Sequence, residues 1–188
     1  MSRPRQFDEK DALEGAMMLF WKRGYGGTNL PDLLDAMGLT RGSFYKAFTD
    51  KHSVYLQALD HYGETRMARA LGELTDRNGP PPHERLTNFF YRTENTPLRP
   101  APRIGCFLCN VMVEMAPFDA ESEARCHRIS QRLWTALYSI VQESAPDQPR
   151  DVLERKATAL QRLYLGSHAM GRMGASFDAW PDLLQELL

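Results

Sequence analysis

The sequence predicts an all-α fold, and three observations support that prediction. Apolar residues recur at spacings of three and four along almost all of the 188 residues, which is the period of an amphipathic helix. Alternation of apolar and polar residues, the signal of a half-buried strand, is scarce. Glycine and proline gather at a few breaks that divide the chain into helix-sized segments, namely residues 24–27, 38, 78–82, 97–102 and 146–149.

Composition limits the possible classes of function. The net charge is −1, from 23 Lys and Arg against 24 Asp and Glu, and 43% of the residues are hydrophobic. That content suits one compact domain or two small ones, and any binding to phosphate depends on local placement of charge. No run approaches the roughly 20 apolar residues of a membrane span, and the N-terminus does not resemble a signal peptide. We therefore expect a cytoplasmic protein without membrane contact, and three reduced cysteines, Cys106, Cys109 and Cys126.

Capping residues define the first helices. An apolar face and an acidic first turn predict a helix over residues 8–23, which ends at Gly24. Asn29 and Asp32 have the spacing of a capping box and predict a second, short helix over residues 30–37.

A turn and a third helix follow directly. Gly38 supplies the left-handed residue that ends the second helix, and Thr40 can cap a third helix that extends to about Phe48. Two short helices joined by a glycine-containing turn form a helix-turn-helix. Asp50 caps a fourth helix over residues 51–74. Gly63 weakens the middle of the fourth helix by about 1 kcal/mol relative to alanine and marks a point of flexibility.

The rest of the chain is expected to be a helical bundle. The predicted domains are therefore residues 1–50, a helix-turn-helix domain, and residues 51–188, a larger helical domain. Further helices are predicted at His83–Glu94, Ile104–Met115, Ala120–Ser144, Arg150–Gly174 and from Phe177, with a long loop that contains Pro97, Pro100 and Pro102.

The third predicted helix carries residues that suit DNA contact. A helix of this kind can enter the major groove and present its first residues to base edges. Arg41 can donate two hydrogen bonds to guanine, and Gly42 allows the backbone to approach DNA closely. The alternative is that these charges are ordinary solvated side chains. The predicted DNA-binding residues are Thr28, Thr40, Arg41, Gly42, Ser43, Tyr45, Lys46 and Lys51, with Arg3 and Arg5 in the preceding tail.

The run GYGGTNLPDLLDAMGLTRGSFYKAFTDKHSVYLQAL resembles the DNA-binding module of TetR-family transcriptional regulators, over about residues 8–60. The shared features are the Gly-Tyr pair, the Ala-x-Gly-Leu turn and the Gly-Ser-Phe-Tyr recognition helix. The resemblance implies that Phe44 and Phe48 face the core. It also implies a homodimeric repressor on a palindromic double-stranded DNA operator, released by a small-molecule effector that binds in residues 51–188.

Predictions for the C-terminal two thirds are less specific. A stripe with small residues on the last long helix permits close approach of a second copy, although an internal core face explains it equally well; it comprises Leu153, Ala157, Leu160, Tyr164, Ser167 and Gly171. Candidates for an effector pocket are mostly aromatic and each suits a core position too; they are Phe89, Phe107, Met112, Trp134, Tyr138, Tyr164 and His168.

Three alternatives stay open at this point. Cys106 and Cys109, on one face of the predicted helix, could sense redox state, and Cys126 and His127 could complete a metal site with them, although no zinc-finger spacing is present. A helical adaptor could use the first domain for protein contacts. Catalysis is not expected, because the chain lacks a phosphate-binding glycine loop, a Gly-x-Ser-x-Gly elbow and a His-Glu-x-x-His motif. No cofactor is expected, and Glu114 could either face a pocket or be solvated.

Overall fold

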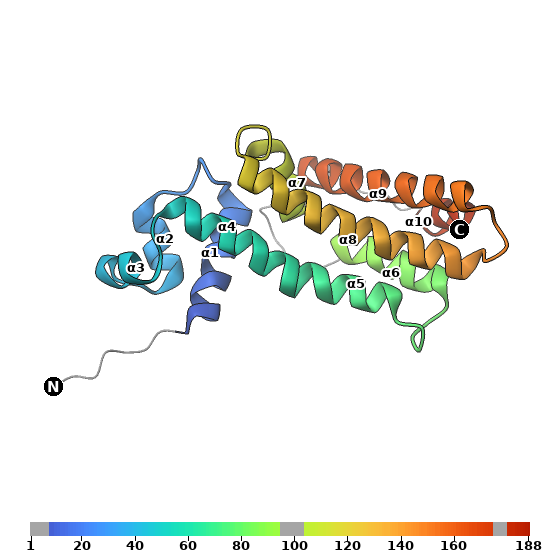
Figure 1. Cartoon of the computed structure of the whole chain (residues 1–188), viewed down its shortest axis with the longest axis horizontal. Helices are drawn as coiled ribbons and strands as arrows, with labels where there is room; N and C mark the ends of the chain where they lie inside the picture. Colours follow the sequence, from blue (N-terminus) through green and yellow to red (C-terminus); the bar gives the residue numbers. More distant parts are fainter. Residues whose placement is uncertain (1–7, 95–103, 175–179) are drawn as a thin grey trace.

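A computed structural model describes residues 8–94, 104–174 and 180–188, and within these ranges every regular element is helical, as predicted. The elongated molecule has two parts (Figure 1). We call the end that contains α1 (Glu9–Arg23), α2 (Leu30–Met37), α3 (Arg41–Ala47) and the first turns of α4 (Lys51–Tyr62) the head. The body contains the remaining helices. Arg3, Arg5, Phe177 and the proline loop at 97–102 lie outside the described residues.

The caps that the sequence predicts at Asn29, Thr40 and Asp50 are confirmed, and Asp8, expected as the first residue of the first helix, is instead its cap. The side chains of Asp8, Asn29, Thr40 and Asp50 each accept a hydrogen bond from a backbone N–H two or three residues further on. Gly38 has φ +65° and ends α2 in the left-handed conformation. The reciprocal half of the capping box was wrong, because the Asp32 carboxylate accepts from Arg23 instead.

The head packs around a small aromatic and aliphatic core. Phe20 of α1, Leu33 of α2 and Phe44 of α3 are fully buried. The crossing of α1 and α2 depends on Gly15, since a Cβ there would overlap the carbonyl oxygen of Ala36. Close helix approach of this kind leaves no room for a side chain, and it fixes the position of the helix-turn-helix on α1.

The long fourth helix of the prediction has a local change of winding at Gly63. A π-helical segment, η1 (Gly63–Met67), follows α4 and leads into α5 (Ala68–Thr75). Arg132 donates to the Gly63 carbonyl at 3.2 Å, and a Cβ on Gly63 would come within 3.1 Å of the Ile129 side chain. Such π segments often interrupt regular helices at functional positions, and this one lies beside α8, where Gly63 meets Ile129 and Arg132.

The body is built around a long antiparallel pair, α8 (Ala120–Ser144) and α9 (Arg150–Met173), as Figure 1 shows. Around this pair lie α5, α6 (Pro82–Glu94), α7 (Phe107–Glu114) and α10 (Trp180–Leu187). The start of α7 corrects the prediction, because Gly105 has φ +63° and Cys106 is extended, so the helix begins three residues later than expected. None of the described helices has the length and apolar character of a membrane span.

The predicted stripe on α9 mostly faces the protein's own core. Leu153, Ala157, Leu160 and Tyr164 are buried within the single chain, so these four side chains are not available to a second copy. Of the two interpretations that the sequence left open, an internal core face and a seam between copies, the core face holds for these four positions. A different face of α9 points outward.

Candidate nucleic-acid interface

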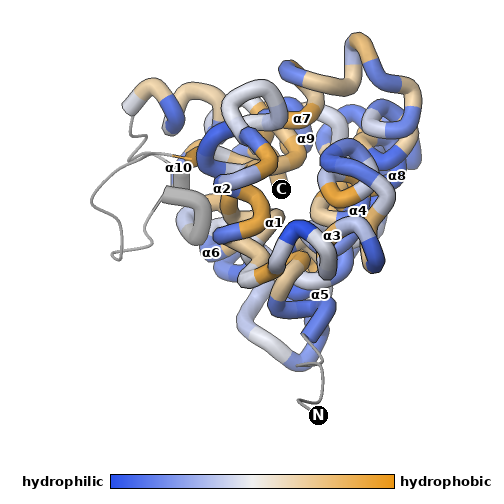
Figure 2. Tube along the Cα trace, turned by 90° about the vertical axis from the view of Figure 1, so that its left-hand side faces the viewer, coloured by the Kyte–Doolittle hydropathy of each residue, from blue (hydrophilic) through white to orange (hydrophobic). Residues whose placement is uncertain are grey.

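The third helix lies at the outer end of the head and exposes its polar residues. Arg41, Tyr45 and Lys46 are exposed, with 53% of the Tyr45 surface accessible, whereas Phe44 and Phe48 are buried beneath them. In Figure 2, which views the molecule from the head end, α3 lies toward the viewer. A short helix anchored by two phenylalanines therefore presents a basic and aromatic face to its surroundings.

Gly42 has no role inside the protein that explains it. A Cβ at this position would meet no heavy atom of the described residues within 4 Å, and Gly42 is not in the left-handed conformation. Glycine within a helix costs about 1 kcal/mol relative to alanine. The absence of a side chain at this position leaves the backbone of the exposed α3 open to close approach from outside the chain.

Two hydroxyl groups at the start of α3, those of Thr40 and Ser43, are hydrogen-bonded to each other. Thr40 Oγ1 accepts from the Ser43 N–H at 3.2 Å and lies 3.0 Å from Ser43 Oγ. This cap fixes the first turn of α3, and each hydroxyl retains capacity for a further hydrogen bond. The first turn of the helix is therefore ordered before any partner binds.

Thr28 and Lys51 have partners inside the head. The Thr28 hydroxyl donates to the Gly24 carbonyl at 2.7 Å and the residue is buried. Lys51 Nζ donates to the carbonyl oxygens of Tyr25 at 2.9 Å and Thr28 at 2.7 Å, and it lies 4.1 Å from the centre of the Tyr25 ring. Both side chains thus connect the α1–α2 turn, residues 24–29, to the structure around it.

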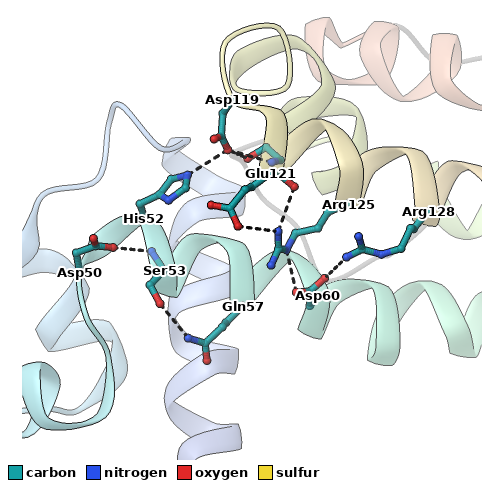
Figure 3. Close-up of polar contacts among 10 residues, drawn as sticks. Asp50, His52, Ser53, Gln57, Asp60, Asp119, Glu121, Arg125 and Arg128 are labelled. Carbon is teal, nitrogen blue, oxygen red and sulfur yellow. Dashed lines mark hydrogen bonds and ion pairs between the residues drawn. The ribbon is translucent and has the colours of Figure 1, made fainter.

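Polar contacts along α4 and α8 join the head to the body (Figure 3). His52 Nε2 lies 3.1 Å from Asp119 Oδ2, at the start of α8. Burial by itself raises the pKa of Asp119, but the hydrogen bonds from Ser122 and His52 outweigh burial and lower it. Further along, Asp60 accepts from Arg125 at 2.9 Å and from Arg128 at 3.2 Å.

The sequence did not show how Glu114 is used. Its carboxylate, at the end of α7, accepts the backbone N–H groups of Tyr25 at 3.1 Å and Gly26 at 2.9 Å. These residues are 89 and 88 positions away from Glu114 in the chain, so no local pattern indicates the contact. The one available signal was the glycine-rich turn itself, which leaves room for a close neighbour.

The structure divides the predicted pocket residues into separate groups. Phe89 stacks on Tyr164 with ring centroids 4.8 Å apart, and Tyr164 contacts His168 at 4.4 Å. Phe107 lies instead among Trp21, Tyr55 and Tyr62 of α1 and α4. Trp134 and Tyr138 stack on one another along α8, and Trp134 donates to Thr158 of α9. Met112, on α7, is half-buried.

Burial makes the cysteines poor candidates for a thiol sensor. Cys106 is not on the same helix as Cys109, because it forms the extended cap of α7. Burial raises the pKa of all three thiols, that of Cys126 to about 12. Reactive cysteines need an accessible thiolate, so the structure does not favour the redox alternative.

The four-ligand metal set is contradicted in the described part of the chain, where no group of three or more His, Cys, Asp and Glu side chains is placed to hold a metal ion. His127 is exposed and pairs with Glu123 at 3.6 Å, while the neighbouring Cys126 is buried. Adjacent helical residues point in different directions, which is why this set does not assemble.

Three features of the head define a helix-turn-helix DNA-binding protein. They are the left-handed turn at Gly38, the capped and exposed helix α3, and the basic face of α3. Comparison with known proteins agrees. The family model described as bacterial regulatory proteins, tetR family, matches residues 12–58. The HTH-type transcriptional regulator YezE of Bacillus subtilis (strain 168) is 30% identical over 138 residues, 73% of this chain and 70% of the relative.

The chain belongs to the TetR family and is a DNA-binding transcriptional regulator. The HTH-type transcriptional repressor ComR of Escherichia coli (strain K12) is 26% identical, over 97% of this chain and 93% of the relative. Among solved structures, a cysteine mutant of the TetR family regulator CifR, complexed with a 26-base-pair double-strand operator DNA, matches with a TM-score of 0.78. It is 22% identical and the match covers 98% of this chain and 97% of that one.

Proposed function

We propose that the protein is a homodimeric repressor that binds a palindromic operator and is released from it by a small-molecule effector. The division of labour follows the predicted domains, with residues 1–50 binding DNA and residues 51–188 binding the effector and the second copy. The observation that carries the proposal is the exposed α3 with its unexplained glycine, Gly42.

In this proposal α3 is the recognition helix. Arg41 donates to a guanine edge, Lys46 and Tyr45 contact the flanking backbone, and Gly42 allows α3 to lie close to the DNA. Thr40 and Ser43, which retain hydrogen-bonding capacity, contact bases or phosphates. The resemblance also assigns DNA contact to Thr28 and Lys51. Because their polar atoms have partners in the head, we assign them the role of holding the recognition helix in place.

The proposed dimer uses the outward face of α9. Residues at spacings of three and four on this face are small or apolar and exposed or half-buried: Ala159, Leu163, Gly166, Met170 and Met173. Met170 and Met173 are 52% and 79% exposed, and a Cβ on Gly166 would meet no described heavy atom within 4 Å. Exposed apolar residues in a row mark protein contacts, and glycine permits close helix approach.

The proposed effector site adjoins the Phe89, Tyr164 and His168 group. His168 is buried, and its Nε2 has no hydrogen-bond partner among the described residues, although buried polar atoms normally have one. Phe89 also lines a groove of about 510 Å³ with residues of α5 and α6, such as Leu74, Arg85 and Asn88. That volume is in the range of sites for small ligands.

Release of the operator requires the effector to bind the DNA-incompetent state more tightly than the DNA-competent one. We propose repression rather than activation because relatives that match most of the chain are named repressors, such as ComR and BdcR of Escherichia coli.

The experiment that tests this proposal is operator binding by the wild type and Arg41→Ala, on a DNA site selected from a random double-stranded library. We expect Arg41→Ala to lower affinity and to relax specificity at one base position, by about 1–3 kcal/mol of discrimination. Specific binding that survives the substitution unchanged contradicts the assignment of α3.

Dimer formation is tested separately with Gly166→Arg, which places a long charged side chain on the outward face of α9. We expect a monomer by analytical ultracentrifugation, with the helical content of the wild type. A variant that remains dimeric shows that α9 uses another face. As a control, Gly72→Arg makes the same change on α5, where an added Cβ would also meet no described heavy atom within 4 Å, and its oligomeric state should match that of the wild type.

A further inference from the structure

Glu114 joins the body to the head through both of its carboxylate oxygens. Its two carboxylate oxygens accept separate backbone N–H groups, Oε2 from Tyr25 at 3.1 Å and Oε1 from Gly26 at 2.9 Å. Successive backbone amides form a natural site for an anion, and hydrogen bonds to a charged acceptor are stronger than neutral ones. The carboxylate therefore fixes the conformation of the α1–α2 turn.

The turn is shaped to receive this carboxylate. A Cβ on Gly24 would lie 2.6 Å from Oε2 and 2.8 Å from Oε1 of Glu114, and Gly24 has φ +76°. A side chain at this position would displace the carboxylate as well as strain the backbone. Gly26 also faces Glu114, with its own Cβ position 3.6 Å from Oε1. Gly24 thus permits a contact that a larger residue would disturb, whereas a Cβ on Gly26 would only be in ordinary van der Waals contact with the carboxylate.

The α1–α2 turn is connected in turn to the helix-turn-helix. Tyr25, whose N–H is bound by Glu114, accepts from Lys51 Nζ through its carbonyl and contacts Tyr55 with ring centroids 4.9 Å apart. Lys51 also binds the carbonyl of Thr28, next to the Asn29 cap of α2. A shift of the turn therefore acts on the start of α2 and on the start of α4.

The opposite end of α7 is connected both to α1 of the head and to α9 of the body. Gly105 accepts from Trp21 Nε1 at 3.0 Å, and its Cβ position lies 3.3 Å from the carbonyl oxygen of His168 in α9. Cys109 donates to the carbonyl of Leu165, also in α9, at 3.5 Å. One short helix of eight residues thus contacts α9 and Trp21 of the head near its start, and the α1–α2 turn of the head at its end.

We propose that Glu114 is a positioning residue for DNA binding, which holds the α1–α2 turn, and through it the recognition helix, in the orientation that binds the operator. Movement of α7 away from the head withdraws the carboxylate, frees the turn and lowers operator affinity. The coupling to an effector rests on the proposed function, but the contact between Glu114 and the turn does not.

The test uses Glu114→Ala and Glu114→Gln in the full chain. In Glu114→Ala neither amide has an acceptor, so hydrogen exchange at Tyr25 and Gly26 accelerates and operator affinity falls by about tenfold or more, the equivalent of about one to two hydrogen bonds. Glu114→Gln retains one carbonyl oxygen and should restore part of the affinity. Glu123→Ala removes an exposed carboxylate that pairs with His127 on the surface of α8; it is the matched control and should bind as the wild type does.

Two outcomes overturn the proposal. If Glu114→Ala is folded and binds the operator with wild-type affinity, Glu114 does not position the head. If affinity falls only in proportion to the folded fraction measured by denaturant unfolding, the role of Glu114 is general stability. Failure of the proposed function looks different, because the wild type itself then shows no specific operator complex, while amide exchange still reports whether Glu114 holds the turn.

Discussion

Replacing Lys51 by methionine separates its two possible roles, phosphate binding and support of the head. Methionine keeps the apolar stem but removes the ammonium, which leaves the carbonyls of Tyr25 and Thr28 without this donor. Each of the two hydrogen bonds from the charged donor contributes about 1.5 kcal/mol to the stability of the fold, and the contact with the Tyr25 ring contributes about 0.5 kcal/mol. Ordering the lysine side chain costs about 1.5 kcal/mol, which we subtract. The free energy of unfolding should therefore fall by about 2 kcal/mol.

The assay is denaturant unfolding at fixed protein concentration, together with operator titration at several salt concentrations. Removing one lysine–phosphate interaction reduces the slope of log affinity against log salt by about 0.9. We expect Lys51→Met to lower stability and leave this slope unchanged. Lys46→Met is the matched control, since Lys46 is exposed on α3; it should leave stability within about 0.5 kcal/mol of the wild type and reduce the slope. A Lys51→Met protein with wild-type stability and a reduced slope would show that the lysine binds phosphate and does not support the head.

Two other substitutions probe the recognition helix and the body. Gly42→Ala should stabilise the free protein by about 0.5–1 kcal/mol, since alanine is the better helix former, and should weaken operator binding; a stabilised variant that binds normally shows that DNA does not approach this backbone. Burial lowers the pKa of His168 to about 4, from an ordinary value of 6.5, so between these values the unfolded chain binds the proton and the folded chain does not. The contribution of His168 to stability is therefore complete above pH 6.5 and is lost as the pH falls to about 4, by up to about 3 kcal/mol. Urea unfolding across this pH range should show a shallower pH dependence for His168→Phe, and identical profiles contradict the burial of an unprotonated imidazole.

The sequence predicted the head well because its signals are local. Asn29, Thr40 and Asp50 cap helices through backbone groups three residues away, and Gly38 ends α2 by its own conformation. Such interactions depend on a few neighbouring residues and are visible in a single sequence.

The parts that sequence could not predict depend on distant contacts. Helical periodicity continued through Gly105, but this residue is left-handed and its carbonyl accepts from Trp21, 84 positions earlier. On α9, apolar residues occupy two faces, and periodicity alone does not say which face meets the chain's own core. Glu114 could be placed on a helix, but its two acceptor contacts with the α1–α2 turn arise only when α7 packs against the head.

One experiment decides whether the chain binds a palindromic operator as a dimer. In it, the wild-type protein selects its binding sites from a random double-stranded DNA library. A homodimeric helix-turn-helix regulator should enrich an inverted repeat whose half-sites are centred about 34–36 Å apart, one turn of DNA, and the stoichiometry should be an even number of chains per site. Arg41→Ala should enrich a repeat with one relaxed position in each half. No enrichment, or enrichment of an asymmetric site bound by a single chain, contradicts the proposed function.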